Sequence, residues 1–471
     1  MFKNKKLMVV GVSIIAILTG SAWAATWERT YPDLPFVGAS SICETYDNGF
    51  AFVGLGKDKD MWLTKVDSLG NLLWTQKIAS GPWQDDPYRI KEAPDKGLIV
   101  VGIDNYPMRA LVVQTDSLGN VIRDTSWIPE GYENAGFFDI THGSDNSWIA
   151  IGYVVISPNA WLYITKLNEK LQIKWEKFYD AITGDKICRD EENYLILGKV
   201  LSTNNNLALT KIDNNGDTLW SRKYLEDGFK NFFFRNIAAT DNGYLLTGSY
   251  WPTINLQIPL FLETDKEGDT LWSKRIEPDS GRGYGEVCWS TKDGYIMVAN
   301  WPVSFPDQAH GAWLVSTDKQ ADILWTKKFA VPGNIANEVR DAHPTRDNGC
   351  IILATTVEDW GINYYPYYPY LIKTDSQGNV GIEENEPVNN RLSLIKVFPN
   401  PSRGLIVFEG EGERETEITV FDILGRKVMT GKTKNGSLKL ELQPGIYFWR
   451  TDKNQGGKII VIRDNSRTDS R

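Results

Sequence analysis

Histidine and cysteine are scarce in this sequence, with 3 His and 4 Cys among 471 residues. That scarcity leaves little for a metal site built from His and Cys ligands. Cys43, Cys188, Cys288 and Cys350 are widely spaced and form no Cys-x-x-Cys pair. We therefore expect small buried side chains at these positions, rather than a disulfide framework or a nucleophile.

Basic clusters and long apolar runs are also missing from most of the chain. With 51 Lys+Arg against 60 Asp+Glu, the formal net charge is -9, which disfavours binding to nucleic acid or to an anionic membrane. The one long apolar stretch is Leu7 to Leu18, with Lys3, Lys5 and Lys6 before it and Ala22-Trp-Ala24 after it. This pattern predicts a cleaved signal peptide over 1–24, export through the Sec route to the periplasm, and a mature chain without a transmembrane segment.

Familiar catalytic motifs are lacking too. The sequence contains no Gly-x-Ser-x-Gly, no His-Glu-x-x-His and no dinucleotide-binding fingerprint. His142, His310 and His343 lie in different parts of the chain without a motif around them. An enzyme that works with carboxylates alone stays open, because paired Asp and Glu residues leave no local signature.

What the chain does contain is a repeat. The segment Lys65-Val-Asp67-Ser-Leu-Gly70-Asn-Leu-Leu-Trp74 returns at intervals of 45 to 57 residues, and a turn-plus-apolar phrase such as Asp47-Asn-Gly49 through Gly54 precedes each copy. Seven anchor residues mark the copies: Asp67, Asp116, Asn168, Asp213, Asp265, Asp318 and Asp375. A repeat of this length is typical of solenoids, propellers or domain arrays.

Each repeat is consistent with four antiparallel strands. In the first, the expected strands are 40–46, 50–54, 61–66 and 72–78, separated by turns rich in Asp, Asn and Gly. Four strands in roughly 50 residues is the size of one propeller blade. We predict an all-β chain with a seven-bladed β-propeller over 25–380, while a β-solenoid and separate sandwiches are the alternatives.

The N-terminal segment is expected to close the ring. Thr26-Trp27 to Tyr31 resembles the fourth strand around Trp74, and the last repeat has no Trp at the matching position 382. Residues near Trp27 would then complete the last blade and leave no exposed edge strand.

Most repeated residues have a structural interpretation. Asp followed three residues later by Gly forms a turn, and the Trp can pack between adjacent blades. Asp213 to Asp217 faintly resembles a calcium loop but lacks its ligand pattern, so no metal site is expected.

Two family resemblances cover the repeats. The Asp-x-x-Gly-x-x-x-Trp phrase resembles the tryptophan-docking motif of pyrroloquinoline-quinone propellers, although the spacing is one residue shorter and the adjacent Cys pair of some quinoproteins is absent. Asp60-Met-Trp62 to Asp67 is similar to repeats of uncharacterised secreted bacterial proteins. The second resemblance implies a fold rather than an activity, and no cofactor is expected; a quinone-dependent oxidoreductase is the third, weaker interpretation.

The C-terminal region has its own pattern of short alternating strands and Pro/Gly turns, which predicts a small β-sandwich. Its motif residues are Pro399, Asn400, Pro401, Asp422, Gly425, Arg426, Pro444, Gly445 and Tyr447. They closely resemble the type A C-terminal sorting domain of the type IX secretion system. The resemblance covers 394–463, after a linker at 381–393 and before a tail at 464–471. It implies recognition by the type IX translocon and its sortase in a Gram-negative bacterium, and a secreted or outer-membrane cell-surface location; an adhesion sandwich is the alternative.

A ligand site is expected at the end of the propeller with the longer loops. Exposed aromatic residues there suit a glycan or protein ligand: Trp83, Tyr88, Trp251, Trp301, His310, Trp360, Tyr364 and Tyr367. The competing interpretation is that these rings pack together as a loop core. If the protein is an enzyme, the acid/base candidates are Asp85, Asp86, Glu133 and Asp307.

The leading hypothesis is therefore an exported, non-enzymatic propeller that acts as a binding module. The alternative is a secreted carboxylate-dependent enzyme that acts on polysaccharide or peptide at the same loops.

Overall fold

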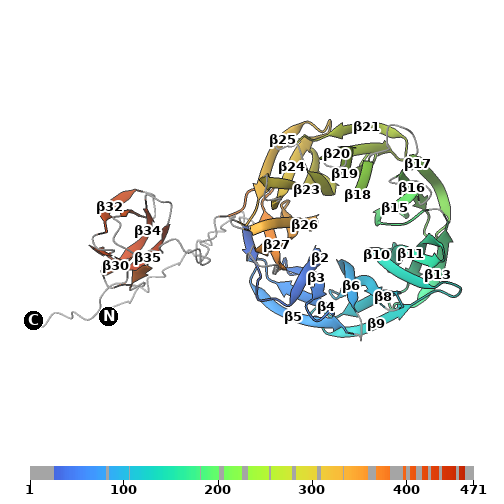
Figure 1. Cartoon of the computed structure of the whole chain (residues 1–471), viewed down its shortest axis with the longest axis horizontal. Coiled ribbons are helices and arrows are strands. Elements are labelled where there is room, and N and C mark those ends of the chain that lie inside the picture. The colour runs from blue at the N-terminus through green and yellow to red at the C-terminus, as the bar shows by residue number, and fades with distance from the viewer. Residues whose placement is uncertain are drawn as a thin grey trace, which may run out of the picture. The chain divides into compact units, whose positions relative to one another are not determined.

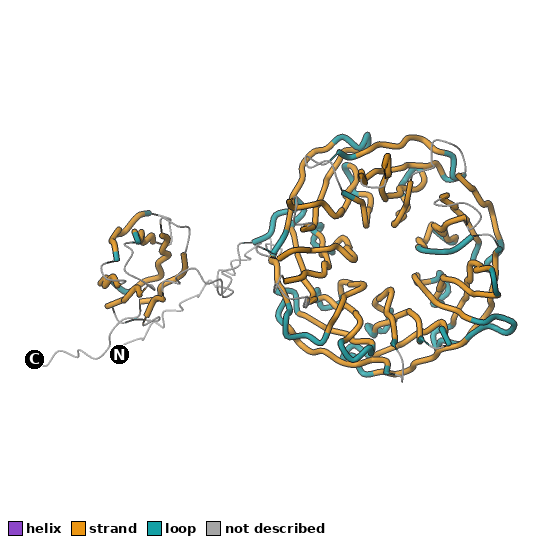
Figure 2. Tube along the Cα trace, viewed as in Figure 1, coloured by secondary structure: helices purple, strands orange, loops and turns teal. Residues whose placement is uncertain are grey.

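The computed structural model describes residues 26–80, 84–105, 107–180, 182–200, 206–224, 232–253, 256–277, 283–304, 309–331, 334–358, 367–381, 396–398, 402, 404–409, 416–422, 426–433, 437–451 and 456–461. Within these ranges the regular structure is strand, and Figure 2 shows no helix there. Accordingly, no helix in the described part is long and apolar enough to cross a membrane. The chain divides into two compact units after residue 381.

The first unit is a ring of seven four-stranded antiparallel sheets, which we call blades 1 to 7 (Figure 1). The first three blades follow chain order. Blade 1 comprises β2 (Phe36–Glu44), β3 (Phe50–Gly56), β4 (Met61–Val66) and β5 (Leu72–Ala79). Blade 2 comprises β6 (Asp85–Glu92), β7 (Leu98–Asp104), β8 (Arg109–Thr115) and β9 (Val121–Trp127). Blade 3 comprises β10 (Asn134–His142), β11 (Trp148–Ile156), β12 (Asn159–Leu167) and β13 (Ile173–Tyr179).

The next three blades repeat this order. Blade 4 comprises β14 (Lys186–Asp190), β15 (Asn193–Val200), β16 (Asn206–Ile212) and β17 (Thr218–Tyr224). Blade 5 comprises β18 (Phe232–Ala239), β19 (Gly243–Thr253), β20 (Leu256–Asp265) and β21 (Thr270–Arg275). Blade 6 comprises β22 (Tyr284–Ser290), β23 (Gly294–Ser304), β24 (Ala309–Asp318) and β25 (Ile323–Phe329). The seven-bladed propeller expected from the repeats is confirmed.

Blade 7 joins the two ends of the propeller. It comprises β26 (Asn334–Pro344), β27 (Cys350–Glu358), β28 (Tyr367–Thr374) and, as its outer strand, β1 (Trp27–Thr30). Trp27 pairs with Lys373 in the antiparallel register of β1 and β28. The predicted closure by the N-terminal strand is confirmed, and it covers an edge of β28 that would otherwise be open to pairing with another chain.

The repeated Trp and Gly residues form the seams between blades. Gly70 adopts a φ of +78°, and a Cβ atom there would come within 2.9 Å of the Trp27 ring. The Trp27 indole N–H donates to the carbonyl of Ser68 at 2.9 Å, in the same turn. Four further pairs repeat this contact: Trp74 with Gly119, Trp175 with Gly216, Trp220 with Gly268, and Trp325 with Gly378. Glycine is favoured at these five positions because the turn has a left-handed backbone and the neighbouring ring lies close to where a side chain would begin. In the third and sixth repeats Leu171 and Ala321 occupy the equivalent position, with φ of 59° and 58°.

The repeated Asp or Asn residues make the turns expected of them. The Asp67 carboxylate accepts hydrogen bonds from the backbone N–H groups of Leu69 and Asn71, both at 2.8 Å. The anchors of the other six repeats form the same pair of bonds. At Asp213 these bonds go to Asn215 and Asp217, so its carboxylate binds its own turn.

The core lies between the blades, because each sheet packs against a neighbour on both faces. Phe50 to Val53 in β3 are consecutive buried residues for this reason, and they belong to the core clusters on either side of blade 1. Cys43 is buried and free, and desolvation raises its pKa to about 12. Cys288 and Cys350 are also buried and Cys188 is half-buried, all without a disulfide, as the sequence predicted.

The second unit is the predicted small β-sandwich. One of its sheets comprises β29 (Lys396–Phe398), β30 (Leu405–Glu409) and β33 (Ser437–Glu441). The other comprises β31 (Glu417–Asp422), β32 (Lys427–Lys432), β34 (Gly445–Thr451) and β35 (Gly456–Val461). Phe408 from the first sheet and Trp449 from the second meet edge to face, with ring centres 5.3 Å apart, in one shared core.

Candidate binding site in the central channel

Each blade presents its first strand to the centre of the ring, as β2, β6, β10, β18 and β26 show in Figure 1. In six of these first strands, the register with the second strand shifts by one residue at the same place. A β-bulge of this kind leaves one residue unpaired and re-aims its side chain. The unpaired residues are Ser40, Tyr88, Phe138, Arg235, Glu286 and Arg340.

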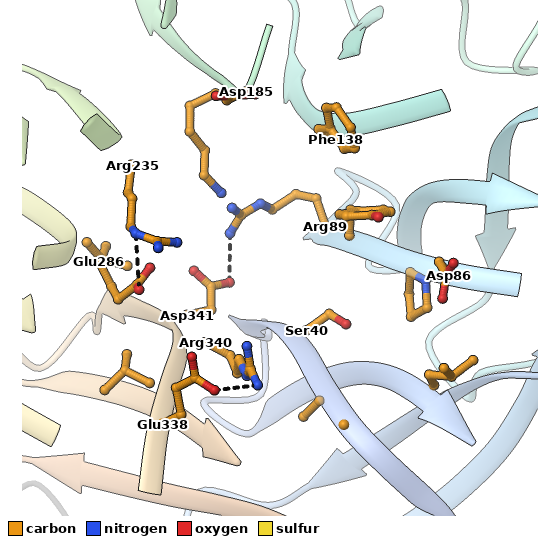
Figure 3. A pocket seen from close by; sticks show the side chains of 18 of the residues that line it. Ser40, Asp86, Arg89, Phe138, Asp185, Arg235, Glu286, Glu338, Arg340 and Asp341 are labelled. Carbon is orange, nitrogen blue, oxygen red and sulfur yellow. Dashed lines mark hydrogen bonds and ion pairs between the residues drawn. The ribbon is translucent and has the colours of Figure 1, made fainter. Parts of the chain in front are cut away.

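Blade 4 has an equivalent residue without a formal bulge in its strand. The N–H of Asp185 donates to the carbonyl of Leu197 at 2.8 Å, while Lys186 is the residue that pairs with Leu197. Asp185 and the six bulge residues, which we call the bulge ring, all line one cavity of about 520 Å³ (Figure 3). That volume falls within the roughly 300–1,000 Å³ of small-molecule sites.

The bulges explain why the apolar strand of each repeat ends in a small residue. Gly54 lies opposite the bulge of blade 1, and a Cβ atom there would lie 2.3 Å from the carbonyl oxygen of Gly38. At Gly102 the corresponding distance to the Asp86 carbonyl oxygen is 2.0 Å. The recurring glycine therefore marks the place where the backbone of the first strand is pushed toward its neighbour.

The cavity lies toward the end of the channel where the chain crosses from one blade to the next. Lys186 is the first residue of β14, and Lys199 lies near the end of the neighbouring strand β15, two residues beyond Leu197, with which Lys186 pairs. Most other lining residues come from the innermost strands around their bulges or, as with Leu55, from the end of a second strand. The crossovers between blades lie at this end, where the sequence predicts a site. The expected longer loops are not general there, since only residues 157–158 join β11 to β12.

Blades 4 to 7 form a charged side of the cavity. The Arg340 guanidinium lies 2.6 Å from the Glu338 carboxylate, which also accepts a hydrogen bond from the Tyr284 hydroxyl at 3.1 Å (Figure 3). Arg235 lies 3.5 Å from Glu286, in an ion pair that Figure 3 also shows. The Lys199 ammonium pairs with Asp185 at 2.9 Å. We call Asp185, Lys186, Lys199, Arg235, Glu286, Glu338 and Arg340 the charged wall.

Glu286 is the acid of this wall with the most altered titration. Burial is the largest cause that raises its pKa, to about 7, and the nearby Glu338 carboxylate adds to the rise, whereas Arg235 and Arg340 oppose it. The amide of Asn300 donates to its carboxylate at 3.4 Å. A carboxyl that is partly protonated near neutral pH can donate a hydrogen bond as well as accept one.

The opposite side is apolar and aromatic. The ring of Tyr88 meets that of Phe138 edge to face, with centres 4.9 Å apart, and Phe138 stacks on Tyr153 at 5.3 Å. Tyr88 remains 38% exposed, so one aromatic ring is available to a ligand. We call Val37, Leu55, Pro87, Tyr88 and Phe138 the aromatic wall.

A buried ionic network stands between the two walls. The Arg89 guanidinium from blade 2 donates to the Asp341 carboxylate of blade 7 at 2.7 Å and lies 3.1 Å from Asp139 of blade 3. Asp341 also accepts hydrogen bonds from the hydroxyl of Ser41 and the N–H of Ile42 in blade 1. The network thus ties four blades together beside the cavity.

The structure brings two of the residues predicted from the sequence into the cavity. Tyr88 is one, and Asp86 is the other: its carboxylate accepts amide hydrogen bonds from Gln84 and Asn105, both at 2.7 Å. Asp85 is buried and is not among the lining residues. Its pKa is raised to about 7, first by burial and then by Asp104 and other acids.

Other predicted residues lie outside the cavity lining. The Trp251 indole donates to the Ser249 hydroxyl at 2.9 Å, and the Trp301 ring lies 4.2 Å from the Lys328 ammonium. Tyr367 is 42% exposed at the start of β28. Glu133 is exposed and accepts a hydrogen bond from Ser157 at 2.7 Å.

Some predicted residues cannot be placed. The signal peptide at 1–24, the linker and tail, Trp83, Trp360, Tyr364, Asp307, Pro399, Asn400, Pro401 and Gly425 lie outside the described residues, as does the side chain of His310. In the part that is described, no group of three or more His, Cys, Asp or Glu residues is arranged to hold a metal ion.

Sequence reasoning missed the charged wall. Arg235, Glu286 and Arg340 stand in short strands without a motif, and they lie far apart in the chain. A signal was nevertheless present: the small residue that ends each apolar strand pairs with the residue before the bulge, as Gly102 pairs with Pro87. In each bulged blade, the residue that follows the partner of this small residue is a member of the bulge ring.

In the second unit, several motif residues stabilise two turns. The Asp422 carboxylate accepts hydrogen bonds from the backbone N–H of Arg426 at 3.0 Å and from its guanidinium at 2.7 Å. The Tyr447 hydroxyl donates to the carbonyl of Gln443, next to Pro444 and Gly445, at 3.0 Å. These bonds show that the motif residues stabilise the connections between strands.

Comparison with known proteins agrees with this fold. The family model for the secretion system C-terminal sorting domain matches residues 396–462. No curated protein matches the sequence of the chain. Among solved structures, a PL25 ulvan lyase bound to -[GlcA(1-4)Rha3S]- is 6% identical with a TM-score of 0.50, covering 74% of this chain and 96% of its own.

Two further structures are also similar at low identity. The polysaccharide lyase Uly1 is 11% identical with a TM-score of 0.49, covering 74% of this chain and 91% of its own. A protein of unknown function from Bacteroides caccae is 13% identical with a TM-score of 0.36, covering 50% of this chain and 81% of its own. Such likeness concerns fold alone. The sorting domain, by contrast, indicates secretion to the cell surface or beyond it. The chain is a seven-bladed β-propeller that carries a type IX secretion system C-terminal sorting domain at residues 396–462.

Proposed function

We propose that the secreted propeller is a binding module whose ligand enters the central cavity. The observation that carries this proposal is the bulge ring, where seven equivalent positions hold Ser40, Tyr88, Phe138, Asp185, Arg235, Glu286 and Arg340. Most repeats keep the same turn, seam and strand-end residues, with Arg123 in place of the seam Trp and Leu171 and Ala321 in place of the turn Gly among the exceptions. The positions at the centre diverge more widely, in both charge and size.

A structural role alone gives little reason for this divergence. A ring that served only to fill the channel would be served by similar apolar side chains in every blade. Here the channel stays open, and polar and aromatic groups converge on one cavity, which is the usual form of a ligand site. The buried Arg89–Asp341 network beside the cavity would hold these side chains in place.

The aromatic residues on the outer loops extend the proposal. Trp251 and Trp301 lie near the ends of β19 and β23, and Tyr367 lies at the start of β28, at the same end of the blades as the cavity. We propose that they contact the parts of a larger ligand that remain outside the channel. Glycans and peptides are the ligand classes that such rings suit.

Export fits this role. The proposed route uses a signal peptide at 1–24, then recognition of the sorting domain by the type IX translocon and its sortase in a Gram-negative bacterium. The propeller would then bind its ligand at the cell surface or in the medium. In this proposal the sorting domain directs export, and the propeller binds the ligand.

A glycan and peptide array tests the proposal. The mature chain is compared with Ser40→Trp, which places a large ring in the cavity, and with Ser68→Trp, which places the same ring on an exposed turn between β4 and β5. Ligands that the wild type and Ser68→Trp retain, but Ser40→Trp does not, would support the central site. An identical array pattern for all three proteins would rule it out.

A second candidate function is carboxylate-dependent hydrolysis, and one observation favours it. Glu286 and Glu338 both line the cavity, and the pKa of Glu286 is raised to about 7 by burial. Two carboxyl groups in unlike environments are the basis of glycosidase acid/base pairs. Product release from polysaccharides that stops in Glu286→Gln, while binding persists, would move the assignment from binding to catalysis.

A further inference from the structure

We propose that the cavity selects an acidic sugar, with its carboxylate against the charged wall and its ring against Tyr88. This inference rests on the proposed function and adds the chemical class of the ligand. Three observations carry it: the unequal charge of the two sides of the cavity, the lack of an ion-pair partner for Lys186 among the described residues, and the exposed ring of Tyr88.

The charged wall carries an excess of positive charge. It has four cationic residues, Lys186, Lys199, Arg235 and Arg340, against three acids. Three of the cations have an acidic partner within 3.5 Å. Lys186 has no ion-pair partner within the described part of the chain, although it lines the cavity. An anionic group of a ligand would supply that partner.

The remaining charges of the cavity do not cancel this excess at the wall. Arg89 and Asp341 are buried together, and their charges are already engaged with each other and with blades 1 and 3. Asp86 belongs to the other side, next to Tyr88, where Gln84 and Asn105 already bind both of its oxygens. A ligand would therefore meet the excess positive charge at the charged wall and, on the other side, the Tyr88 ring beside the hydrogen-bonded carboxylate of Asp86.

The aromatic wall favours a sugar over a small inorganic anion. A free phosphate or sulfate could pair with Lys186, but it would leave Tyr88 and the apolar side chains of Val37 and Leu55 without contact. A pyranose ring has one apolar face of C–H groups that can cover an aromatic ring, together with hydroxyl groups for polar neighbours. Both sides of the cavity are used only if the ligand joins such a ring to an anionic group.

Three disaccharides of similar size test the inference by calorimetry: digalacturonate, cellobiose and the glucosamine dimer, which are anionic, neutral and cationic. The mature full chain, with the sorting domain, is titrated at pH 6.5 and low salt. We expect digalacturonate to bind at least ten-fold more tightly than the other two. We expect Lys186→Gln to bind digalacturonate about ten- to a hundred-fold more weakly than the wild type, which is the range for loss of a hydrogen bond to a charged group. Lys170→Gln, on an exposed turn, is the matched control.

Tyr88→Leu tests the other wall, and thermal unfolding of every variant verifies that it folds. A ring contact predicts weaker binding of digalacturonate to Tyr88→Leu with little change for free phosphate. Digalacturonate binding that neither Lys186→Gln nor Tyr88→Leu alters would overturn the inference.

The failure of this inference is distinguishable from the failure of the proposed function. Tighter binding of cellobiose or the glucosamine dimer, abolished in Ser40→Trp, would remove the preference for acidic sugars and leave the central binding site in place. If no disaccharide binds, and no arrayed ligand depends on Ser40, both ideas are wrong.

Discussion

Arg89 and Asp341 face each other at 2.7 Å although 252 residues separate them in the chain. Their contact joins blade 2 to blade 7 across blade 1, whose Ser41 hydroxyl donates to the same carboxylate. Asp139 lies on the other side of the guanidinium, so one cation serves two buried acids. The point where the ring closes is therefore also a point where charge is buried.

Loss of either partner is expected to destabilise the propeller. Asp341→Ala leaves Arg89 with one acid, and Arg89→Leu leaves two acids without their cation, at a cost of about 3–5 kcal/mol for a broken buried pair. Denaturant unfolding measures the change. Arg222→Ala, which removes an exposed ion pair with Asp269, is the control and should hardly change the midpoint. An equal loss of unfolding free energy on breaking the Arg89–Asp341 pair and the Arg222–Asp269 pair would contradict this prediction.

Gly70 is expected to tolerate no side chain because of the Trp27 ring above it. Gly70→Ala combines a left-handed backbone with a contact at 2.9 Å, and should lower the unfolding free energy by about 1–3 kcal/mol. Gly131→Ala is a matched control, since its φ is +86° but nothing lies within 4 Å of the added atom. The difference between the two variants measures the contribution of the seam, and a difference near zero would mean that only backbone strain matters.

Asp85 should make the propeller less stable as the pH rises. Burial and neighbouring acids raise its pKa from 3.8 to about 7 in the folded chain. The folded state therefore holds this proton more tightly than the unfolded chain, and its contribution to stability is lost as the pH rises from about 4 through 7. Asp85→Asn should be more stable than the wild type at pH 8, by about 1–3 kcal/mol, and not at pH 4. A constant difference at both pH values would argue against titration of this group.

Binding of an acidic sugar should weaken with rising pH because of Glu286. Its neighbours are Arg235 from β18, Asn300 from β23, and Glu338 and Arg340 from β26. As Glu286 loses its proton near pH 7, the excess positive charge of the charged wall falls from two to one, because four cations then face three ionised acids. Digalacturonate affinity should fall several-fold between pH 6 and pH 8 in the wild type, and stay nearly level in Glu286→Gln. Parallel curves for the two proteins would show that another group controls the pH dependence.

Two separate unfolding transitions are expected in calorimetry. The propeller and the sorting domain have their own cores, and the chain divides into two units after residue 381. Removal of 382–471 should eliminate one transition and leave the other at its temperature within a degree or two. A large shift in the remaining transition would indicate that the units stabilise each other.

The fold could be predicted from the sequence because its signals are local and repeated. Asp67, Gly70 and Trp74 each act within one turn or one seam, and seven copies make the pattern plain. Closure by Trp27 was recognisable for the same reason. The residues of the cavity were harder to predict, because a bulge depends on how two strands pair and not on one segment. Arg235, Glu286 and Arg340 also belong to three different blades and come together only in the folded ring. Asp86 and Tyr88 were predicted as part of a crossover, and the structure places both in β6, at its bulge.

The β-bulge separates two tasks that neighbouring residues perform. Ser40 faces the channel, whereas Ser41, the next residue, accepts a hydrogen bond from the N–H of Ile90 in the following blade. The same alternation recurs at Phe138 and Asp139, whose carboxylate binds the N–H of Ile187. Substitutions at the channel-facing positions can thus accumulate without disturbing the contacts between blades. New ligand preferences can evolve, or be selected from a library, on this scaffold at little cost to its folding.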